Sequence, residues 1–336
     1  MTDEFYMQLA LNQAWKYQLL TYPNPAVGAV VVHKGRILAV EAHQKAGTSH
    51  AEVLALVGAY GAMQGSKIEF DPTDALVAHE FLLSLPDGFF GECEMYVTLE
   101  PCSHEGKTPS CANLLQTLGL KRVVIGINDP IKGHDGGVDI LRQSIDDSRI
   151  KVGVLQEECK ALIEPFLIWQ ERAFVLFKLA QTANGRIGGG YLSCDASLRH
   201  VHRLREACDT LLIGGNTVRT DRPTLDCRFT GGRAPDVMIY SREKDLDREI
   251  PLFHVQEREV TIADNLSLLE QPSFILAEGG EGLLNALKEK IDWILLYQTP
   301  KLSTHDLSYN TAMNLAFLHH RDMDVDMMIW SKKIGH

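Results

Sequence analysis

The hydrophobic positions in the first half of the chain change period several times, from the spacing of helices to the short runs of strands. Residues 5–19 have helical spacing. The apolar runs at residues 27–32 and 37–40 flank a Lys-Gly turn, which predicts a β-hairpin. A second helical pattern opens at His50 and continues to Tyr60. Helix and strand alternate, so we expect a sheet layered with helices.

The same alternation continues toward the middle of the chain. A buried strand is expected at residues 95–99, a helix that begins at Cys111, and another strand at residues 122–127. Residues 61–92 break this rhythm with turn-rich stretches around a helical segment, and we interpret them as an insertion of unassigned role. Residues 140–153 are expected to form a helix and a turn.

A boundary is expected near residues 155–172, which gives domains at 1–155 and 172–336. Beyond it, residues 174–180 have the pattern of a strand and residues 198–207 that of a helix. Four more strand candidates follow, at residues 210–215, 237–240, 273–277 and 293–297. The second half is therefore predicted to be α/β as well.

Composition supports this division. The chain has 336 residues, 45% hydrophobic and 23% charged, as in soluble globular proteins, and its length suits two domains of about 150 residues. No apolar run reaches the roughly 18–20 residues that span a bilayer, and the acidic residues 1–4 do not resemble a signal peptide. We therefore expect a cytoplasmic protein with no membrane partner.

The formal net charge of −11 argues against a nucleic-acid partner, because a phosphate backbone requires a basic face. A small anionic substrate remains compatible with this charge, since a local group of Lys and Arg can bind one phosphate. The seven cysteines are scattered and odd in number, so we do not expect a disulfide framework. Two of them, Cys102 and Cys111, are instead candidate metal ligands.

His50, Glu52, Cys102 and Cys111 follow the order of a zinc-dependent nucleobase deaminase. One imidazole and two thiolates leave the fourth position of a zinc ion open, and the metal lowers the pKa of a bound water to about 7. Glu52 lies two residues after His50, and we expect it to carry the water's proton to the ring and to the leaving ammonia. Cysteines at this spacing are often independent core residues. The complete set, with His50 and Cys111 at predicted helix starts, favours the metal site.

The eight residues between Cys102 and Cys111 are more than in the common Cys-x-x-Cys. With the stretches Tyr22-Pro23-Asn24-Pro25-Ala26-Val27-Gly28, His50-Ala51-Glu52 and Thr98 to Cys111, this spacing resembles the riboflavin-pathway pyrimidine deaminases that are fused to a reductase. The resemblance implies a cytidine-deaminase-like α/β/α layered domain. It also implies substrate contacts from Asn24, His43, His104, Lys107 and Asp129. The insertion at residues 61–92 is a departure from this family. We expect it to change the rim of the substrate pocket and not the metal ligands.

Glycine-rich turns follow strand candidates in the second half, at residues 188–190, 214–215 and 279–280. Such turns let backbone N–H groups approach a pyrophosphate. None forms Gly-x-Gly-x-x-Gly, so a plain Rossmann domain is not indicated. Tight turns that bind no ligand are the alternative interpretation.

Three stretches resemble the riboflavin-pathway reductase domain: residues 177–187, 212–225 and 277–284. The resemblance implies a dihydrofolate-reductase-like α/β fold and hydride transfer from NADPH to an opened ribosyl imine, with the cofactor carrying the hydride chemistry. It places Lys178, Asp221 and Glu278 at the substrate and nicotinamide. It places four residues at the dinucleotide: Gly214, Thr217, Gly279 and Gly280.

This half also departs from the family. Tyr191-Leu192-Ser193 stands where Trp-Ile-Thr is usual, Asn184 stands where an aspartate is usual, and Ser303-Thr304-His305-Asp306 replaces a glycine-rich loop. Ser193 keeps a hydroxyl that can bind phosphate. Arg205 is a second phosphate candidate, with a solvated helix face as the alternative. We expect the reductase to be active.

Several functions remain in competition. The first is a bifunctional enzyme that deaminates a phosphoribosylaminopyrimidine with one zinc ion and then reduces it with NADPH, as a homo-oligomer (a dimer or tetramer). The second is a deaminase whose C-terminal half is a degenerate oligomerisation module. The third is a non-catalytic zinc-stabilised binding protein, against which Glu52 argues, because a purely structural site needs no general base. A nucleic-acid deaminase is disfavoured by the negative charge.

Overall fold

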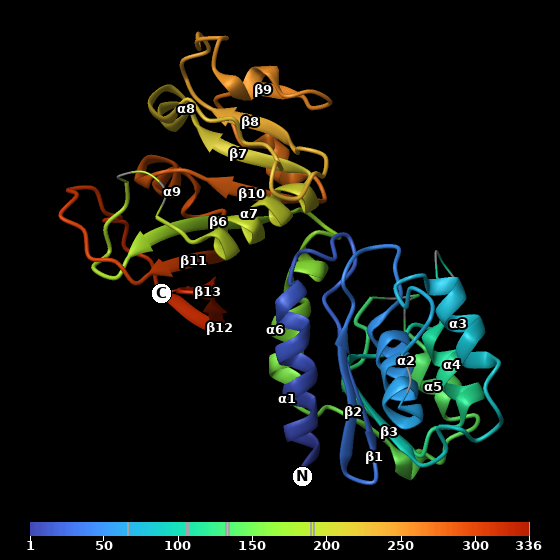
Figure 1. The fold of residues 1–336 in the computed structure, drawn as a ribbon. Helices are drawn as coiled ribbons and strands as arrows, with labels where there is room; N and C mark the ends of the chain where they lie inside the picture. The colour runs from blue at the N-terminus through green and yellow to red at the C-terminus, as the bar shows by residue number, and fades with distance from the viewer. Residues whose placement is uncertain are drawn as a thin grey trace. The chain divides into compact units, whose positions relative to one another are not determined.

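Strands and helices alternate through two consecutive units, Met1–Leu167 and Ile168–His336, each with a sheet of its own (Figure 1). The computed structural model describes residues 1–65, 67–104, 106, 108–131, 133, 135–188, 190 and 192–335. Both units are mixed α/β, as the pattern of the sequence predicts. Each unit buries its own hydrophobic core.

The first unit is built on a five-stranded sheet in the order β2-β1-β3-β4-β5. The expected hairpin is confirmed, because β1 pairs with β2 in antiparallel register. Its turn residues Lys34 and Gly35 both have positive φ, 49° and 80°. Strand β3 is antiparallel to β1 and parallel to β4, which is parallel to β5. The strands are β1 Gly28–His33, β2 Arg36–Ala42, β3 Cys93–Leu99, β4 Arg122–Ile127 and β5 Ile150–Val152.

Helices cover both faces of this sheet, with α1 and α6 on one side and α2 to α5 on the other (Figure 1). Gly28 faces α1, and a Cβ there would lie 2.0 Å from the Ala10 carbonyl oxygen, so the close approach of α1 to β1 requires glycine. The next residues, Ala29 and Val31, face the other core with α2. The helices are α1 Asp3–Ala14 with the 3₁₀ turn Trp15–Tyr17, α2 Ala51–Gln64, α3 Ala75–Leu83, α4 Cys111–Leu118, α5 Gly137–Leu141 and α6 Gln156–Ile168.

Two segments of the first unit differ from the sequence-based expectation. The helix expected within residues 140–153 begins earlier, at Gly137, and ends at Leu141; a 3₁₀ turn, Asp147–Arg149, and strand β5 follow it. Residues 156–168, expected only as part of a boundary, form α6. Its buried positions include Cys159, Leu162 and Phe166, which have helical spacing.

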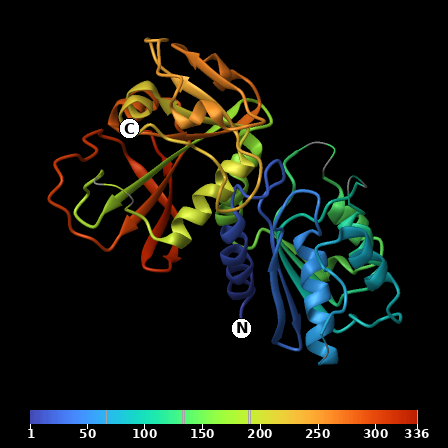
Figure 2. The same ribbon diagram turned by 45° about the horizontal axis from the view of Figure 1, so that its top comes forward.

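The second unit is built on an eight-stranded sheet in the order β12-β13-β11-β6-β10-β7-β8-β9. Its six strands from β11 to β9 are parallel, whereas β13 and β12 add antiparallel pairs at one edge (Figure 2). The edge strands β9 and β12, and β13 next to β12, were not expected from the sequence. The strands are β6 Ala173–Thr182, β7 Thr210–Gly214, β8 Asp236–Tyr240, β9 Val260–Ala263, β10 Ser273–Glu278, β11 Trp293–Thr299, β12 Leu315–Met323 and β13 Asp326–Lys333.

Alternate side chains of these strands supply two layers of core. Val175 and Phe177 of β6 pack with α9 residues such as Leu283 on one face. Tyr297 of β11 points to the opposite face, where its hydroxyl lies 2.5 Å from Nδ1 of His200 on α7. The helices are α7 Asp195–Ala207, α8 Gly215–Asp221 and α9 Glu281–Leu287, with 3₁₀ turns at Pro251–His254 and Ser267–Glu270. Within the described residues, no helix is both long and apolar enough to span a bilayer.

Candidate active sites

The first site lies where two helices begin. His50 is the extended N-cap residue of α2, and Cys111 is the first residue of α4. The Nδ1 atom of His50 is 3.7 Å from Sγ of Cys102 and 3.4 Å from Sγ of Cys111. The three ligand atoms all lie within 4.8 Å of one another. One imidazole nitrogen and two sulfurs form the donor set of a catalytic zinc site, so these residues fit the metal.

The loop between the two cysteines is fixed by hydrogen bonds of its own. Ser110 caps α4 by accepting from the Asn113 N–H, and its hydroxyl donates to the Cys102 carbonyl at 2.8 Å. The Cys111 N–H points at Cys102 Sγ, 3.3 Å away. Hydrogen bonds from Cys111 and His50 lower the pKa of Cys102 to about 4 in the metal-free chain. These contacts favour the thiolate form of Cys102, which is the form that binds a metal.

Thr108 is a functional candidate that the sequence did not reveal. Its Oγ1 lies 3.2 Å from Nε2 of His50. If Nε2–H donates to this hydroxyl, Nδ1 remains free for the metal, and the ring orientation is fixed. A threonine between two cysteines carries no recognisable signal in one sequence, which is why only the fold shows its role.

Glu52 stands in the first turn of α2, with only 4% of its surface exposed. Burial, with a smaller contribution from the Cys102 charge, raises its pKa to about 7 in the metal-free chain, while His50 opposes this shift. A carboxyl group whose pKa lies near neutrality can both accept and donate a proton. The location of Glu52 next to the ligand cluster thus suits a general base.

His43 and Asn24 meet beside His50. Asn24 Nδ2 is 3.2 Å from His43 Nε2, and His43 Nδ1 is 3.1 Å from the Ser49 carbonyl oxygen. Burial and the His50 charge lower the pKa of His43 to about 4, so the ring is neutral. A neutral ring explains both contacts, with Nδ1–H donating to Ser49 and Nε2 accepting from Asn24. The His43 and His50 rings pack edge to face, 5.3 Å apart.

The loops after β3 and β4 are joined by Glu100, which was not singled out from the sequence. Its carboxylate accepts from the N–H groups of Asp129 and Val138, both at 2.9 Å. Asp129 is thereby held at the end of β4 and in turn accepts from the Ile131 N–H. His104 is exposed on the loop between the cysteines. Lys107, also expected to contact substrate, lies outside the described residues.

Residues 61–92, the segment expected to be an insertion, reach back toward this site. The Thr73 carbonyl accepts the Ser49 N–H at 2.9 Å, directly before His50. The rings of Phe81 and Phe89 pack against Tyr60 of α2, at 4.9 and 5.5 Å. The insertion therefore contacts both ends of the helix that carries His50 and Glu52.

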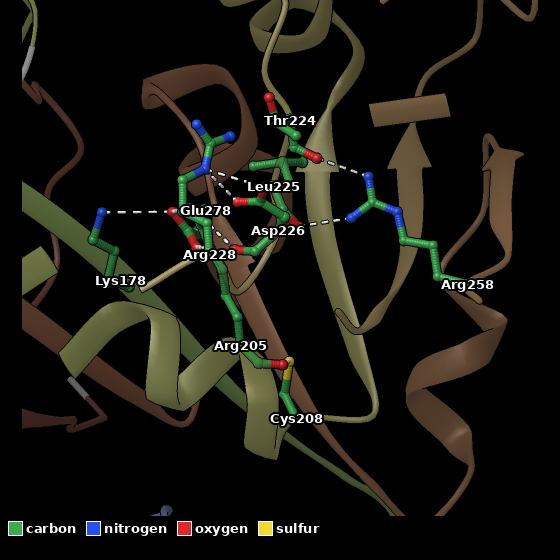
Figure 3. A network of polar contacts seen from close by, with 9 residues as sticks. All are labelled: Lys178, Arg205, Cys208, Thr224, Leu225, Asp226, Arg228, Arg258 and Glu278. Carbon is green, nitrogen blue, oxygen red and sulfur yellow. Dashed lines mark hydrogen bonds and ion pairs between the residues drawn. The ribbon is translucent and has the colours of Figure 1, made fainter. Parts of the chain in front are cut away.

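A second site is formed by three charged residues of the other unit (Figure 3). Lys178 on β6 and Glu278 on β10 are register partners on adjacent parallel strands, with Nζ 3.5 Å from Oε2. Arg205 on α7 binds the same carboxylate through Nε at 2.8 Å and Nη2 at 3.0 Å. Burial would raise the pKa of Glu278, but the charges of Arg205 and Lys178 overcome it and hold the pKa at about 2. Glu278 is therefore a stable carboxylate.

Two arginines hold the neighbouring loop by its backbone. Arg205 Nη1 donates to the Asp226 carbonyl at 3.4 Å. Arg258 donates to the carbonyls of Thr224 at 2.8 Å and Leu225 at 2.6 Å. Figure 3 shows the loop between these two arginines, with Lys178 on the far side of Glu278. Arg258 precedes β9, far from any motif, and could not be assigned from the sequence.

The predicted cofactor residues gather at the carboxyl ends of β7 and β10, which are adjacent and parallel. A Cβ added to Gly279 would lie 2.9 Å from Leu283 Cδ2 and 3.6 Å from Thr217 Oγ1. A Cβ on Gly280 would meet no protein atom within 4 Å. Gly214 ends β7 and caps α8. Ligands of open α/β sheets bind at this end of the strands, and the open space beside Gly280 leaves room for one.

Two predicted residues are not joined to this cluster. Asp221 ends α8 and is exposed, and among the described residues no hydrogen bond or ion pair links it to Lys178 or Glu278. Ser193 is half-buried, two residues before α7 begins. Their assigned roles therefore stay predictions.

Comparison with known proteins extends over both units. Residues 1–127 match the cytidine and deoxycytidylate deaminase zinc-binding region, and residues 173–303 match the RibD C-terminal domain. The riboflavin biosynthesis protein RibD of Aquifex aeolicus is 34% identical over 296 residues, which are 86% of this chain and 72% of that protein. RibD of Mycobacterium tuberculosis is 30% identical over 317 residues, 88% of this chain and 84% of that protein.

A solved structure agrees with these matches. A Thermotoga maritima protein described as a diaminohydroxyphosphoribosylaminopyrimidine deaminase/5-amino-6-(5-phosphoribosylamino)uracil reductase is 28% identical, with a TM-score of 0.66 and 99% of each chain covered. The similarity thus includes both the zinc-ligand unit and the unit with the Lys178–Glu278 pair. The chain therefore belongs to the RibD family of riboflavin biosynthesis proteins, with a deaminase and a reductase domain in one polypeptide.

Proposed function

We propose that the first unit deaminates diaminohydroxyphosphoribosylaminopyrimidine by hydrolysis, and that the second reduces the resulting 5-amino-6-(5-phosphoribosylamino)uracil with NADPH. The substrates are those in the description of the Thermotoga maritima protein. The observation that carries the proposal is the convergence of His50, Cys102 and Cys111 within 4.8 Å, with Glu52 buried in the first turn of the same helix as His50.

In the deaminase, zinc, when bound, supplies a Lewis acid that makes water a nucleophile at neutral pH. Glu52 takes a proton from the attacking water and delivers it to the ring nitrogen and then to the departing ammonia. Asn24 and neutral His43 orient the pyrimidine through their polar edges. We assign Asp129 to the ribosyl phosphate region, and we assign His104 and Lys107 to other contacts with the substrate. Thr108 keeps the His50 ring in the tautomer that leaves Nδ1 available.

In the reductase, NADPH, when bound, supplies the hydride. Lys178 and Glu278 orient the opened ribosyl imine, and Lys178 provides the proton that its nitrogen gains. Arg205 uses three N–H groups on Glu278 and Asp226, and the remaining N–H groups can bind the phosphate with Ser193. Gly214, Thr217, Gly279 and Gly280 border the dinucleotide, and Asp221 approaches it from α8.

A split assay tests the proposal. Purified, zinc-quantified protein receives the diaminopyrimidine ribosyl phosphate with and without NADPH, and ammonia release and NADPH oxidation are followed separately. Ammonia release followed by NADPH oxidation supports both activities. Ammonia release alone would favour the deaminase with a degenerate second unit, and no ammonia from zinc-loaded protein would overturn the substrate assignment.

The expected assembly and location also stand as proposals. An exposed edge supports a homo-oligomer, because Phe317 of edge strand β12 is 76% exposed and Leu315 is 37% exposed. The net charge of −11 supports the absence of a nucleic-acid partner. The cytoplasmic location stays an expectation from the sequence. Light scattering of the purified chain distinguishes a monomer from a dimer or tetramer.

A further inference from the structure

The chain between β11 and β12 makes specific contacts at both ends. We call residues 301–313 the strap. Its first part is bonded to the loop after β6: the Ala183 N–H donates to the Lys301 carbonyl at 2.8 Å, and the Ile187 N–H to the Leu307 carbonyl at 2.9 Å. The Lys301 ammonium also donates to the Leu192 carbonyl at 2.7 Å. This end of the strap therefore holds the segment that leads to Ser193.

The second part of the strap is bonded to the turn between β10 and α9. The Tyr309 hydroxyl donates to the Gly279 carbonyl at 2.9 Å. The Asn310 N–H donates to the Glu281 carboxylate at 2.9 Å, and the Thr311 hydroxyl to Oδ1 of Asn285 at 2.9 Å. The strap thus connects the proposed substrate side of the reductase with its proposed cofactor side.

The Gly279-Gly280 turn needs such support. Two successive glycines have the largest backbone freedom, and no side-chain hydrogen bond caps α9 at Gly280. The ring of Tyr309 is packed against the core cluster that includes Leu283 and Leu284. Burial raises the pKa of Tyr309 to about 12, so its hydroxyl keeps the proton that it donates. The hydroxyl is therefore a fixed donor on an anchored ring, directed at the residue between Glu278 and Gly280.

We propose that Tyr309 is a positioning residue of the reductase site, whose hydroxyl fixes the Gly279-Gly280 turn in the conformation that receives NADPH. The inference rests on the proposed function of the second unit. A turn already held in its binding conformation loses less conformational entropy when the cofactor binds, and the affinity is correspondingly higher. Without this hydrogen bond, the turn would have to be ordered by the cofactor itself.

The test compares two variants of the full chain by titrating NADPH fluorescence. Tyr309→Phe removes only the hydroxyl that reaches Gly279, and we expect the Kd for NADPH to rise about 3- to 10-fold, the effect of one neutral hydrogen bond. Thr311→Val removes a hydroxyl from the same strap that reaches only the Asn285 side chain, and its Kd should stay within about 2-fold of the parent. A melting curve for each variant checks that both remain folded.

Steady-state kinetics provide a second readout. Tyr309→Phe should raise the KM for NADPH with little change in kcat, and ammonia release should be unchanged. A Kd for Tyr309→Phe equal to that of the parent, or an equal loss in Thr311→Val, would overturn the inference.

Gly280→Ala tests the cofactor site independently of Tyr309. The added methyl group meets open space in the protein, so this substitution should not impair folding. If Gly280→Ala weakens NADPH binding and Tyr309→Phe does not, the cofactor site stands and the role of Tyr309 fails. If the parent chain binds no NADPH, both the reductase assignment and this inference fail.

Discussion

The two sites of this chain are assembled in different ways. In the first unit, the groups that form the site stand at the starts of α2 and α4, and Cys102 and Cys111 are joined by one short loop. In the second unit, Glu278 meets Lys178 and Arg205, which are 100 and 73 residues away in sequence. A metal site built on helix starts leaves a spacing pattern in the sequence. A charge cluster formed by strand register does not.

The sites also differ in how their charges are balanced. A bound metal cation would compensate the negative charge of the thiolates in the cluster of His50, Cys102 and Cys111. Glu278 is balanced inside the protein by Arg205 and Lys178, whose side chains are only 13% and 18% exposed. The first site should therefore respond most to changes around the metal, and the second to the loss of a charged partner.

The largest difference between the effects on the two activities is expected from Glu52→Gln. Removing the general base should lower ammonia release about 10³-fold, while zinc content stays near one per chain, because Glu52 is not a ligand. NADPH oxidation with the deaminated substrate should be unchanged, and this serves as the folding control. Ammonia release above about a tenth of the parent rate would contradict the role of Glu52.

The opposite result, loss of the reductase activity with the deaminase activity preserved, is expected from Lys178→Ala. Loss of the ammonium beside Glu278 should lower NADPH oxidation about 10²-fold, because a charge placed at the reacting centre is removed. Ammonia release should be preserved. The matched control is Lys290→Ala, which removes an exposed lysine of the same unit. Equal damage to both activities would show that the sites are not independent.

A smaller effect is expected from Thr108→Val. Removing the hydroxyl that contacts Nε2 of His50 should lower zinc affinity about 10-fold, as is typical for partners of metal-binding histidines. Competition with a chromogenic chelator measures the change. Thr117→Val removes a hydroxyl that bonds only the Asn113 carbonyl of its own helix, and it should leave the affinity unaltered. If the two variants behave alike, Thr108 does not orient His50.

A further prediction concerns the pH dependence of stability in the second unit. Burial, with the charges of Arg321 and Arg203, lowers the pKa of His200 from 6.5 to about 3. The unfolded chain therefore binds a proton below pH 6.5 that the folded chain does not, and stability falls as the pH is lowered from 6.5 toward 3. Urea unfolding followed by tryptophan fluorescence measures this, since Trp330 lies beside His200. In His200→Gln the slope over this range should be smaller; an unchanged slope would assign the effect to another group.

Much of the fold near the first site was accessible from the sequence. The hairpin, the helix that begins at Cys111 and the strand at residues 122–127 are confirmed, because each has a clear period and a clear turn or cap. Helix α6 was missed because Pro165 within it indicates a break. Strand β12 was missed because its polar run His319-His320-Arg321-Asp322 has no apolar alternation, which is common at an exposed edge. The apolar run at residues 327–330 of β13 was overlooked.

Of the site residues, the sequence could propose those with a motif and not those that act through the backbone. His50, Cys102 and Cys111 meet as expected, and Lys178 and Glu278 are paired. Thr108, Glu100, Arg258 and Tyr309 contact carbonyls, N–H groups or a ring nitrogen that only the fold brings near them. Asp221, Ser193, His104 and Lys107 remain predictions from the resemblance.

The place of the expected insertion, residues 61–92, determines how this part of the chain can vary in length. Helix α2 runs 14 residues away from His50, about 21 Å, and β3 returns toward Cys102, so the insertion begins and ends far from the ligands. Loop-closure entropy changes slowly with length, by about 0.6 kcal/mol for each doubling, so extra residues between His50 and Cys102 cost little stability if the Thr73 contact with Ser49 is kept. The short step from Cys102 to Cys111 has no such freedom.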